Sequence, residues 1–279
     1  MNALEIKNVC KSFSGFCLDN ISLTLPCGCI MGLIGENGAG KSTTIKLILD
    51  MLHKDSGTIT ILGRENGKDT LIKEEVGVVM DEVGFPECLT AGQIGKVMKH
   101  TFRHWNEAEY DRHLQKLSLP ANKPFKDFSR GMKMKLGIAV AMSHGAKLLL
   151  LDEPTSGLDP VVRDEVVEMF YDFTRDENHS ILISSHIVSD LERLCDYVAF
   201  LHKGKLLLCE EKDALLSEYG IVHCTADRLS ALDKNAVKHK KETPYGVEVM
   251  VSRKDVPDAF KISPISMEEL FVFMVKEAK

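Results

Sequence analysis

Polar and apolar residues alternate along the first part of the chain, between Ala3 and Leu25. The recurring apolar positions are Leu4, Ile6 and Val9, followed by Ile21, Leu23 and Leu25. Alternation is typical of strands that bury one face, because successive side chains point to opposite sides of a sheet. We therefore expect short antiparallel strands in this N-terminal region.

The elements predicted next are apolar strands separated by helices. The runs that fit buried strands are residues 30–34, 76–80, 147–151 and 180–185. Helical spacing of apolar residues dominates over 90–143 and again over 161–175. Fully apolar strands that alternate with helices indicate an α/β fold with parallel strands. The sequence thus predicts a main α/β domain over residues 1–210, with a helical subdomain at about 88–146.

Residues 211–279 are predicted to form a small C-terminal α+β appendage. Residues 236–241 and 247–252 favour a hairpin joined through the turn at 243–246. Ser266 and Glu269 have the spacing of a capping box, which predicts a final helix. The appendage carries no catalytic motif. We favour a packing role for it over that of a regulatory ligand domain, which stays open.

Composition limits the classes of protein to which the chain can belong. Of its 279 residues 44% are hydrophobic and 27% are charged, as in ordinary soluble proteins. No apolar run reaches the roughly 18 residues of a membrane helix, and the N-terminus lacks the pattern of a signal peptide. The net charge of −6 argues against broad nucleic-acid binding. The 8 scattered cysteines favour reduced thiols and a cytoplasmic location.

The strongest chemical motif runs from Gly35 to Thr43, between a predicted strand and a predicted helix. It matches G-x-x-x-x-G-K-[ST], the phosphate-binding P-loop, in which glycines let backbone N–H groups converge on phosphate oxygens. We expect Lys41 to contact the β- and γ-phosphates and the Ser42 hydroxyl to hold Mg²⁺. The predicted nucleotide-binding residues are Gly35, Glu36, Asn37, Gly38, Ala39, Gly40, Lys41, Ser42 and Thr43.

Polar residues also follow other predicted strands, at the edge where open α/β sheets bind ligands. Asp152 and Glu153 come directly after four leucines. We predict that Asp152 holds Mg²⁺, directly or through water, and that Glu153 accepts a proton from an attacking water. Asp81 and His186 end two further strands. Each alone is more typical of a surface position, but together these strand ends favour a shared phosphate pocket.

Taken together, the motifs resemble those of the nucleotide-binding subunit of ABC transporters, over residues 4–210. After the P-loop and the acidic strand end come a D-loop at 156–159 and a switch histidine at His186, in the order of that family. The resemblance implies a P-loop NTPase of ABC type with ATP and Mg²⁺ as cofactors. It also implies that Phe13 stacks on adenine, although packing of this ring on the core fits the local sequence equally well. The catalytic residues that it implies are Lys41, Glu153 and His186.

Two segments depart from the pattern of the family. The signature, usually L-S-G-G-Q, reads Phe-Ser-Arg-Gly-Met at residues 128–132. Ser129 and Gly131 keep the groups expected to contact the ATP of an opposing subunit, whereas Arg130 replaces a glycine and is expected to swing to solvent. The glutamine of the Q-loop aligns with Asp81, which can hold Mg²⁺ through water. These departures resemble bacterial exporter ATPases related to bacitracin-resistance and acetoin-linked transporters.

The implied function is that of an ATP-binding and hydrolysing subunit that powers a membrane transporter, an exporter in the favoured interpretation. Two subunits would close on ATP, as a homodimer or a heterodimer. A transmembrane permease would contact residues 90–143 and hold the subunit at the inner face of the cell membrane. Alternatives left open are a soluble ABC ATPase without a transporter and a cassette that senses nucleotide with little turnover. The single P-loop and the lack of a heptad-rich insertion argue against translation and DNA-repair classes, so no nucleic-acid partner is expected. No motif identifies the cargo or the permease.

Overall fold

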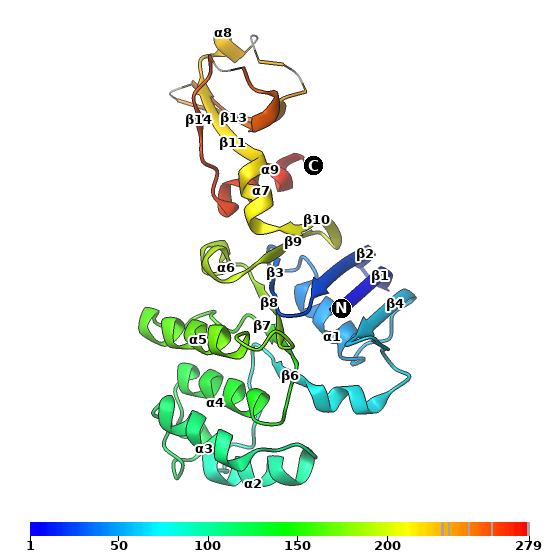
Figure 1. Ribbon diagram of the computed structural model, residues 1–279, viewed down its shortest axis with the longest axis vertical. Coiled ribbons are helices and arrows are strands. Elements are labelled where there is room, and N and C mark those ends of the chain that lie inside the picture. The colour runs from blue at the N-terminus through cyan, green and yellow to red at the C-terminus, as the bar shows by residue number, and fades with distance from the viewer. Residues whose placement is uncertain (230–231, 234, 245, 258, 278–279) are drawn as a thin grey trace. The chain divides into compact units, whose positions relative to one another are not determined.

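The computed structural model describes residues 1–279 except 230–231, 234, 245, 258 and 278–279. The chain divides into two compact units, Met1–Cys209 and Glu210–Lys279 (Figure 1). Among the described residues, the first unit contains two sheets and the second contains one, and each unit has its own cluster of buried apolar side chains.

An antiparallel sheet begins the first unit and has the strand order β2-β1-β4-β5. Its strands are β1 (Asn2–Phe13), β2 (Phe16–Pro26), β4 (Ser56–Ile61) and β5 (Arg64–Glu65). The alternating apolar residues of β1 and β2 are buried, as the sequence predicts. The expectation of short strands was wrong, because β1 has 12 residues and β2 has 11. Irregularities in the β1–β2 register, such as the one between Ile6 and Val9, explain why a strict period of two is lost along these strands.

A six-stranded sheet forms the centre of the same unit, in the order β10-β9-β3-β8-β7-β6. It comprises β3 (Ile30–Ile34), β6 (Val76–Val79), β7 (Leu148–Asp152), β8 (Ser180–Ser185), β9 (Tyr197–His202) and β10 (Lys205–Glu211). The pairs of β3 with β8 and β9, of β7 with β8 and of β6 with β7 are parallel, which confirms the α/β prediction. Every residue of β3, β7 and β8 is buried, which is the physical basis of their apolar runs.

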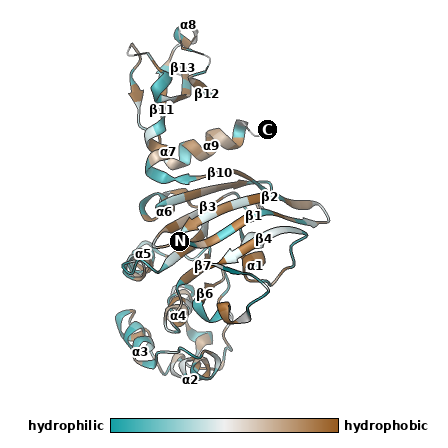
Figure 2. Cartoon of the chain, turned by 45° about the vertical axis from the view of Figure 1, so that its right-hand side comes forward, coloured by the Kyte–Doolittle hydropathy of each residue, from teal (hydrophilic) through white to brown (hydrophobic). Residues whose placement is uncertain are grey.

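Helices alternate with the strands along the chain of this unit. They are α1 (Lys41–Ile48), α2 (Ala91–Thr101), α3 (Glu107–Lys116), α4 (Arg130–Met142), α5 (Pro160–Phe173) and α6 (Val188–Leu194), with short 3₁₀ turns at Thr70–Glu75 and Phe125–Asp127. Figure 1 shows α2, α3 and α4 grouped together beyond β6. Thr90 and Gln93 form the capping box that starts α2. Helix α3 is mostly hydrophilic (Figure 2) and buries Tyr110 and Leu114 against its neighbours.

The second unit is a four-stranded sheet with short helices. Its strand order is β12-β13-β11-β14, built from β11 (Tyr219–Cys224), β12 (Val237–Thr243), β13 (Gly246–Ser252) and β14 (Ile262–Ser263). The predicted hairpin is confirmed as the antiparallel β12–β13 pair; its turn includes position 245, which lies outside the described residues. The helices are α7 (Lys212–Glu218), α8 (Ala226–Leu229) and α9 (Met267–Glu277). Ser266 and Glu269 make the reciprocal hydrogen bonds of the predicted capping box before α9.

Over the ranges that the structure describes, every helix is too short or too polar to cross a lipid bilayer.

Candidate functional site

The P-loop forms one wall of an open pocket of about 450 Å³ at the carboxyl end of β3. Helix α1 begins at the far end of this loop, so the loop lies between a buried strand and a helix N-terminus. That is the arrangement in which a glycine-rich loop binds phosphate. The pocket is lined by Phe16, Glu36, Asn37, Gly38, Gly40, Lys41, Ser42, Thr43, Asp81 and Glu153.

Two glycines of the loop are required by close packing. A Cβ added at Gly35 would lie 2.5 Å from the carbonyl oxygen of Leu201 in β9. Gly40 precedes α1 with a φ of 114°, and a Cβ there would lie 2.6 Å from Leu18 Cδ2. Gly38, with a φ of 80°, would meet nothing within 4 Å and faces open space. The first two positions therefore fix the loop against the sheet, while the third leaves room for a ligand.

The Lys41 ammonium group is buried at the base of the pocket. Its Nζ donates to the carbonyl oxygens of Gly35 and Glu36, at 2.8 and 3.4 Å, and pairs with Glu153 Oε1 at 3.0 Å. Lysine is fully buried only where its charge is compensated. Its carboxylate partner occupies the position of a counterion, and phosphate oxygens would have to compete with Glu153 for Lys41.

Asp152 ends β7 and is almost wholly buried. Its Oδ1 accepts a 2.6 Å hydrogen bond from the hydroxyl of Ser184, which lies opposite it in β8. Ser184 was not predicted as a site residue; the available signal was a hydroxyl in a mostly apolar strand. This hydrogen bond fixes the orientation of the predicted Mg²⁺ ligand.

Glu153 connects the P-loop lysine to the predicted switch histidine. Its Oε2 accepts from Nδ1 of His186 at 2.7 Å, while its Oε1 faces Lys41. Glu153 has a φ of 52°, a left-handed conformation that costs a non-glycine residue about 1 kcal/mol or more. Its N–H donates to Ser184 Oγ at 3.1 Å, which helps to hold this backbone. The predicted residues Lys41, Glu153 and His186 are thus brought together in one chain of contacts.

The predicted Mg²⁺ ligands supply the oxygen atoms that this ion prefers. Ser42 and Asp81 both line the pocket. The buried Asp152 lies at the end of β7, directly before Glu153, which also lines the pocket. Within the described residues, no group of three His, Cys, Asp or Glu side chains could hold a metal on its own. Mg²⁺ keeps several waters and binds one or two protein oxygens together with substrate phosphates, so the residues present fit such an ion.

The signature residues lie outside this pocket of their own chain. Ser129 is the N-cap of α4, and its Oγ accepts from the N–H of Met132 at 3.3 Å. Gly131 packs close to Val162 of α5. The Arg130 side chain forms an ion pair with Asp81, with Nη2 and Oδ1 3.0 Å apart. The Arg130 side chain is exposed to solvent as expected, but it also has an acidic partner that the sequence did not predict.

The aromatic residue that lines the pocket is Phe16. Phe13 is 43% exposed at the end of β1, and its ring centroid lies 6.4 Å from that of Phe16. Phe16 packs against the loop, where a Cβ at Gly40 would lie 3.0 Å from its Cζ. The role of Phe13 toward adenine stays a prediction, and Phe16 is a candidate that the sequence reasoning missed.

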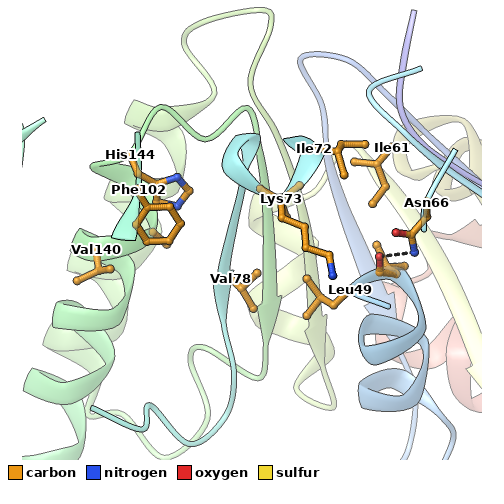
Figure 3. A pocket seen from close by; sticks show the side chains of 12 residues that line it. Leu49, Ile61, Asn66, Ile72, Lys73, Val78, Phe102, Val140 and His144 are labelled. Carbon is orange, nitrogen blue, oxygen red and sulfur yellow. Dashed lines mark hydrogen bonds between the residues drawn. The ribbon is translucent and has the colours of Figure 1, made fainter. Parts of the chain in front are cut away.

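A second pocket, of about 220 Å³, is apolar and shares no lining residue with the first (Figure 3). Phe102 and His144 stack at 4.0 Å on one side of it, and burial lowers the pKa of His144. Asn66 donates to the backbone at the end of α1 on the other side. None of the predicted site residues lines this pocket.

Strand, glycine loop, buried lysine and an acidic strand end define the class as P-loop nucleotide-binding proteins. Residues 18–156 match the ABC transporter family. A lantibiotic transport ATP-binding protein of Streptococcus pyogenes, SrtF, is 39% identical over 213 residues, which are 75% of this chain and 91% of that protein. The bacitracin transport ATP-binding protein BcrA of Bacillus licheniformis is 37% identical, over 68% of this chain and 63% of its own.

Among solved structures, the ATP-binding subunit of an ABC transporter superposes with a TM-score of 0.69. It is 29% identical, over 76% of this chain and 91% of that one. The chain belongs to the ABC transporter family as an ATP-binding subunit. The predicted ABC-type fold and the predicted resemblance to bacitracin-resistance ATPases are confirmed.

Proposed function

We propose that this chain hydrolyses Mg²⁺–ATP in a dimer and thereby drives a transmembrane permease, with export as the direction of transport. The observation that carries the proposal is the contact chain from Lys41 through Glu153 to His186 at the P-loop pocket. A cassette that only senses nucleotide would need the lysine and the loop but not a carboxylate held by a histidine.

Each residue has a specific role in this proposal. Lys41 and the loop N–H groups bind the β- and γ-phosphates, and Ser42, Asp152 and Asp81 supply oxygens for Mg²⁺. Mg²⁺, when bound, would neutralise phosphate charge. Glu153 accepts the proton of the attacking water, while the hydrogen bond from His186 orients its carboxylate.

The partner subunit completes the site. Ser129 and Gly131 are proposed to contact the γ-phosphate of ATP held by the P-loop of the opposing subunit. The adenine would stack on Phe13 or on Phe16, which lies closer to the loop. Residues 1–210 are proposed as the ATPase domain and residues 211–279 as a packing appendage.

The permease partner places the chain at the inner face of the cell membrane in this proposal. The helical region from α2 to α4 is the proposed contact for that partner. Lantibiotics and bacitracin, the compounds in the names of two relatives, are the first cargoes to test.

The test combines nucleotide binding, turnover and partner capture. By calorimetry, Lys41→Ala should weaken ATP binding about tenfold or more, because a charge-assisted contact to phosphate is lost. Lys46→Ala, on the same helix but outside the pocket, is the matched control. Unchanged binding in Lys41→Ala would contradict the assigned site.

Mg²⁺-dependent phosphate release by the wild-type chain would separate an ATPase from a nucleotide sensor. Failure to co-purify with a multi-span protein encoded by a neighbouring gene would favour a soluble ATPase.

A further inference from the structure

The Arg130 side chain bridges two loops that follow neighbouring strands. Its Nη2 lies 3.0 Å from Oδ1 of Asp81, just beyond β6. Its guanidinium also lies against Gly157 in the loop after β7, where an added Cβ would be 2.8 Å from Nη1. Because β6 and β7 are adjacent parallel strands, both loops lie at the same edge of the sheet. Arg130 is the first residue of α4, so this helix is connected to both loops through one side chain.

Asp81 is shared by two neighbouring pockets. One is the P-loop pocket, where Asp81 lines the same space as Lys41 and Ser42. The other has a volume of about 450 Å³ and is lined by Asp81, Glu82, Val83, Arg130, Lys133 and Met134. The carboxylate can therefore be reached by a ligand of the P-loop on one side and by Arg130 on the other.

The ion pair is weak enough to be exchanged. The side chains of Arg130 and Asp81 are 55% and 52% exposed. Ion pairs this exposed contribute little to stability, because water screens the charges and two side chains lose freedom. Mg²⁺ bound to a triphosphate is a stronger partner for a carboxylate than one exposed guanidinium.

We propose that Arg130 is a positioning residue that competes with Mg²⁺ for the Asp81 carboxylate. This inference rests on the proposed function. When Mg²⁺–ATP occupies the P-loop, Asp81 turns toward the metal and its waters, and Arg130 is released from both loops. Nucleotide binding at the P-loop is thereby transmitted to the first turn of α4, which Ser129 caps. The acid at 81 and the arginine at 130, each a departure from the family pattern, act as a matched pair.

The competition predicts an effect of opposite sign with and without the metal. The probe is a non-hydrolysable ATP analogue, titrated by calorimetry into the full chain in Mg²⁺ and in EDTA. In Mg²⁺, Arg130→Gln should tighten binding of the analogue about two- to fivefold, because the ion pair between Arg130 and Asp81 no longer has to be broken before Asp81 turns to the metal. In EDTA the same variant should weaken binding by a similar factor, because the uncompensated carboxylate repels the triphosphate. A purely structural role would change both affinities in the same direction.

Two further variants isolate the pair. Lys133→Gln removes a cation from the same pocket without touching Asp81, because Lys133 Nζ lies over the ring of Phe125 at 4.8 Å. It should leave both affinities unchanged. In an Asp81→Asn background the effect of Arg130→Gln should disappear, as a double-mutant cycle requires for a direct interaction.

The outcomes separate this inference from the proposed function. Thermal unfolding confirms beforehand that each variant is folded. If the wild-type chain fails to bind the analogue in Mg²⁺, the proposed function is overturned. If the wild type binds but Arg130→Gln changes nothing, shifts both affinities the same way, or acts equally in the Asp81→Asn background, the competition is overturned and the proposed function stands. An equal effect of Lys133→Gln would assign the change to the general charge of the surface, which also overturns the specific pairing.

Discussion

At the scale of single residues, Glu153 has an ion pair and a proposed catalytic role that have opposite effects on ATP. Its carboxylate is the counterion of Lys41, and it is also the group proposed to take a proton from water. A phosphate that binds Lys41 must displace this carboxylate, so part of the binding free energy of ATP is used to free it. The residue proposed to act on ATP therefore also weakens ATP binding.

Glu153→Gln should separate these two effects. The amide keeps the size of the side chain but loses its negative charge and its basicity. We expect the affinity for ATP to rise about tenfold, as for removal of one charge-assisted competitor, while turnover falls by a factor of about 10² or more. Calorimetry and phosphate release measure the two quantities, and size-exclusion chromatography would detect an ATP-loaded dimer. Turnover equal to that of the wild type would assign the base to another carboxylate, with Asp81 the first to test.

At the scale of elements, the residue that caps the N-terminus of α4 has two separable roles. Ser129 caps the helix through Met132 N–H, and it is also proposed to contact ATP of the opposing subunit. A helix cap needs an acceptor oxygen, whereas a phosphate contact needs a donor. Aspartate satisfies the first requirement and opposes the second.

Ser129→Asp and Ser129→Ala therefore make a diagnostic pair. Ser129→Ala should lower the free energy of unfolding by about 1 kcal/mol through loss of the cap. Ser129→Asp should keep the stability of the wild type but lose most ATPase activity, because its charge repels the γ-phosphate. Chemical denaturation and phosphate release measure the two effects. An active Ser129→Asp variant would remove Ser129 from the site.

Ion pairs of Glu75, the residue before β6, stabilise the fold by an amount that depends on pH. A hydrogen bond from Lys147 holds the pKa of the Glu75 carboxyl below the ordinary range. Burial opposes this shift, and a hydrogen bond from Arg64 adds to it. Because this pKa is lower in the folded chain, the pairing contributes its full stability above the ordinary pKa of about 4.3. That contribution is lost as the pH falls through the lowered value.

Glu75→Gln should accordingly flatten the acid side of the stability curve. At pH 7 we expect the variant to be less stable by about 1 kcal/mol, and below pH 4 its stability should approach that of the wild type. Urea denaturation across this range measures the difference. Glu248, an acid in the second unit paired with Lys241, provides the matched control substitution Glu248→Gln. A constant difference at all pH values would show that packing, not charge, explains the effect.

At the scale of the whole molecule, the proposed composite site makes the activity a property of two chains. Mixing Lys41→Ala subunits with Ser129→Arg subunits places both lesions on one of the two sites of a mixed dimer and leaves the other intact. Some ATPase activity should then return, up to about half of the wild-type rate per mixed dimer if the two sites act independently. Cross-linking should confirm that mixed dimers form. Mixed dimers without any recovered activity would contradict action of Ser129 across the dimer.

The sequence predicted the parts of the site that are local along the chain. The P-loop and the buried strand before Asp152 each depend on residues within a few positions of one another, as does the predicted capping box of α9 outside the site. Contacts between distant segments were not predictable. Ser184 reaches Asp152 because β8 pairs with β7 in one particular register, and Arg130 meets Asp81 because β6 ends beside α4. The apolar content of one strand does not encode that register.

Strand β9 illustrates the same limit for the fold. Its residues Tyr197–His202 were not predicted as a strand, yet the carbonyl of Leu201 in β9 is what excludes a side chain at Gly35. The P-loop motif predicts a glycine at this position. The physical reason is the position of β9 next to β3 in the sheet, which leaves no room for a Cβ. The sequence also led to too short an estimate for the lengths of β1 and β2, where irregularities in the register interrupt the alternation.

The position of β3 in the sheet has a consequence for synthesis on the ribosome. β3 ends at Ile34, but both of its neighbours, β8 (Ser180–Ser185) and β9 (Tyr197–His202), come much later in the chain. At about 5–20 residues per second, roughly 150 residues separate the emergence of β3 from that of its first partner, a delay of about 8–30 s. During this interval the apolar strand that carries the P-loop has no sheet to join, and ATP cannot stabilise it. Met31 and Leu33 of β3 share one buried cluster with apolar side chains of β1 and β2, which are synthesised before β3. We therefore expect a substitution that destabilises the β1–β2 hairpin to lower the yield of folded protein during synthesis more than the yield on refolding of the full chain.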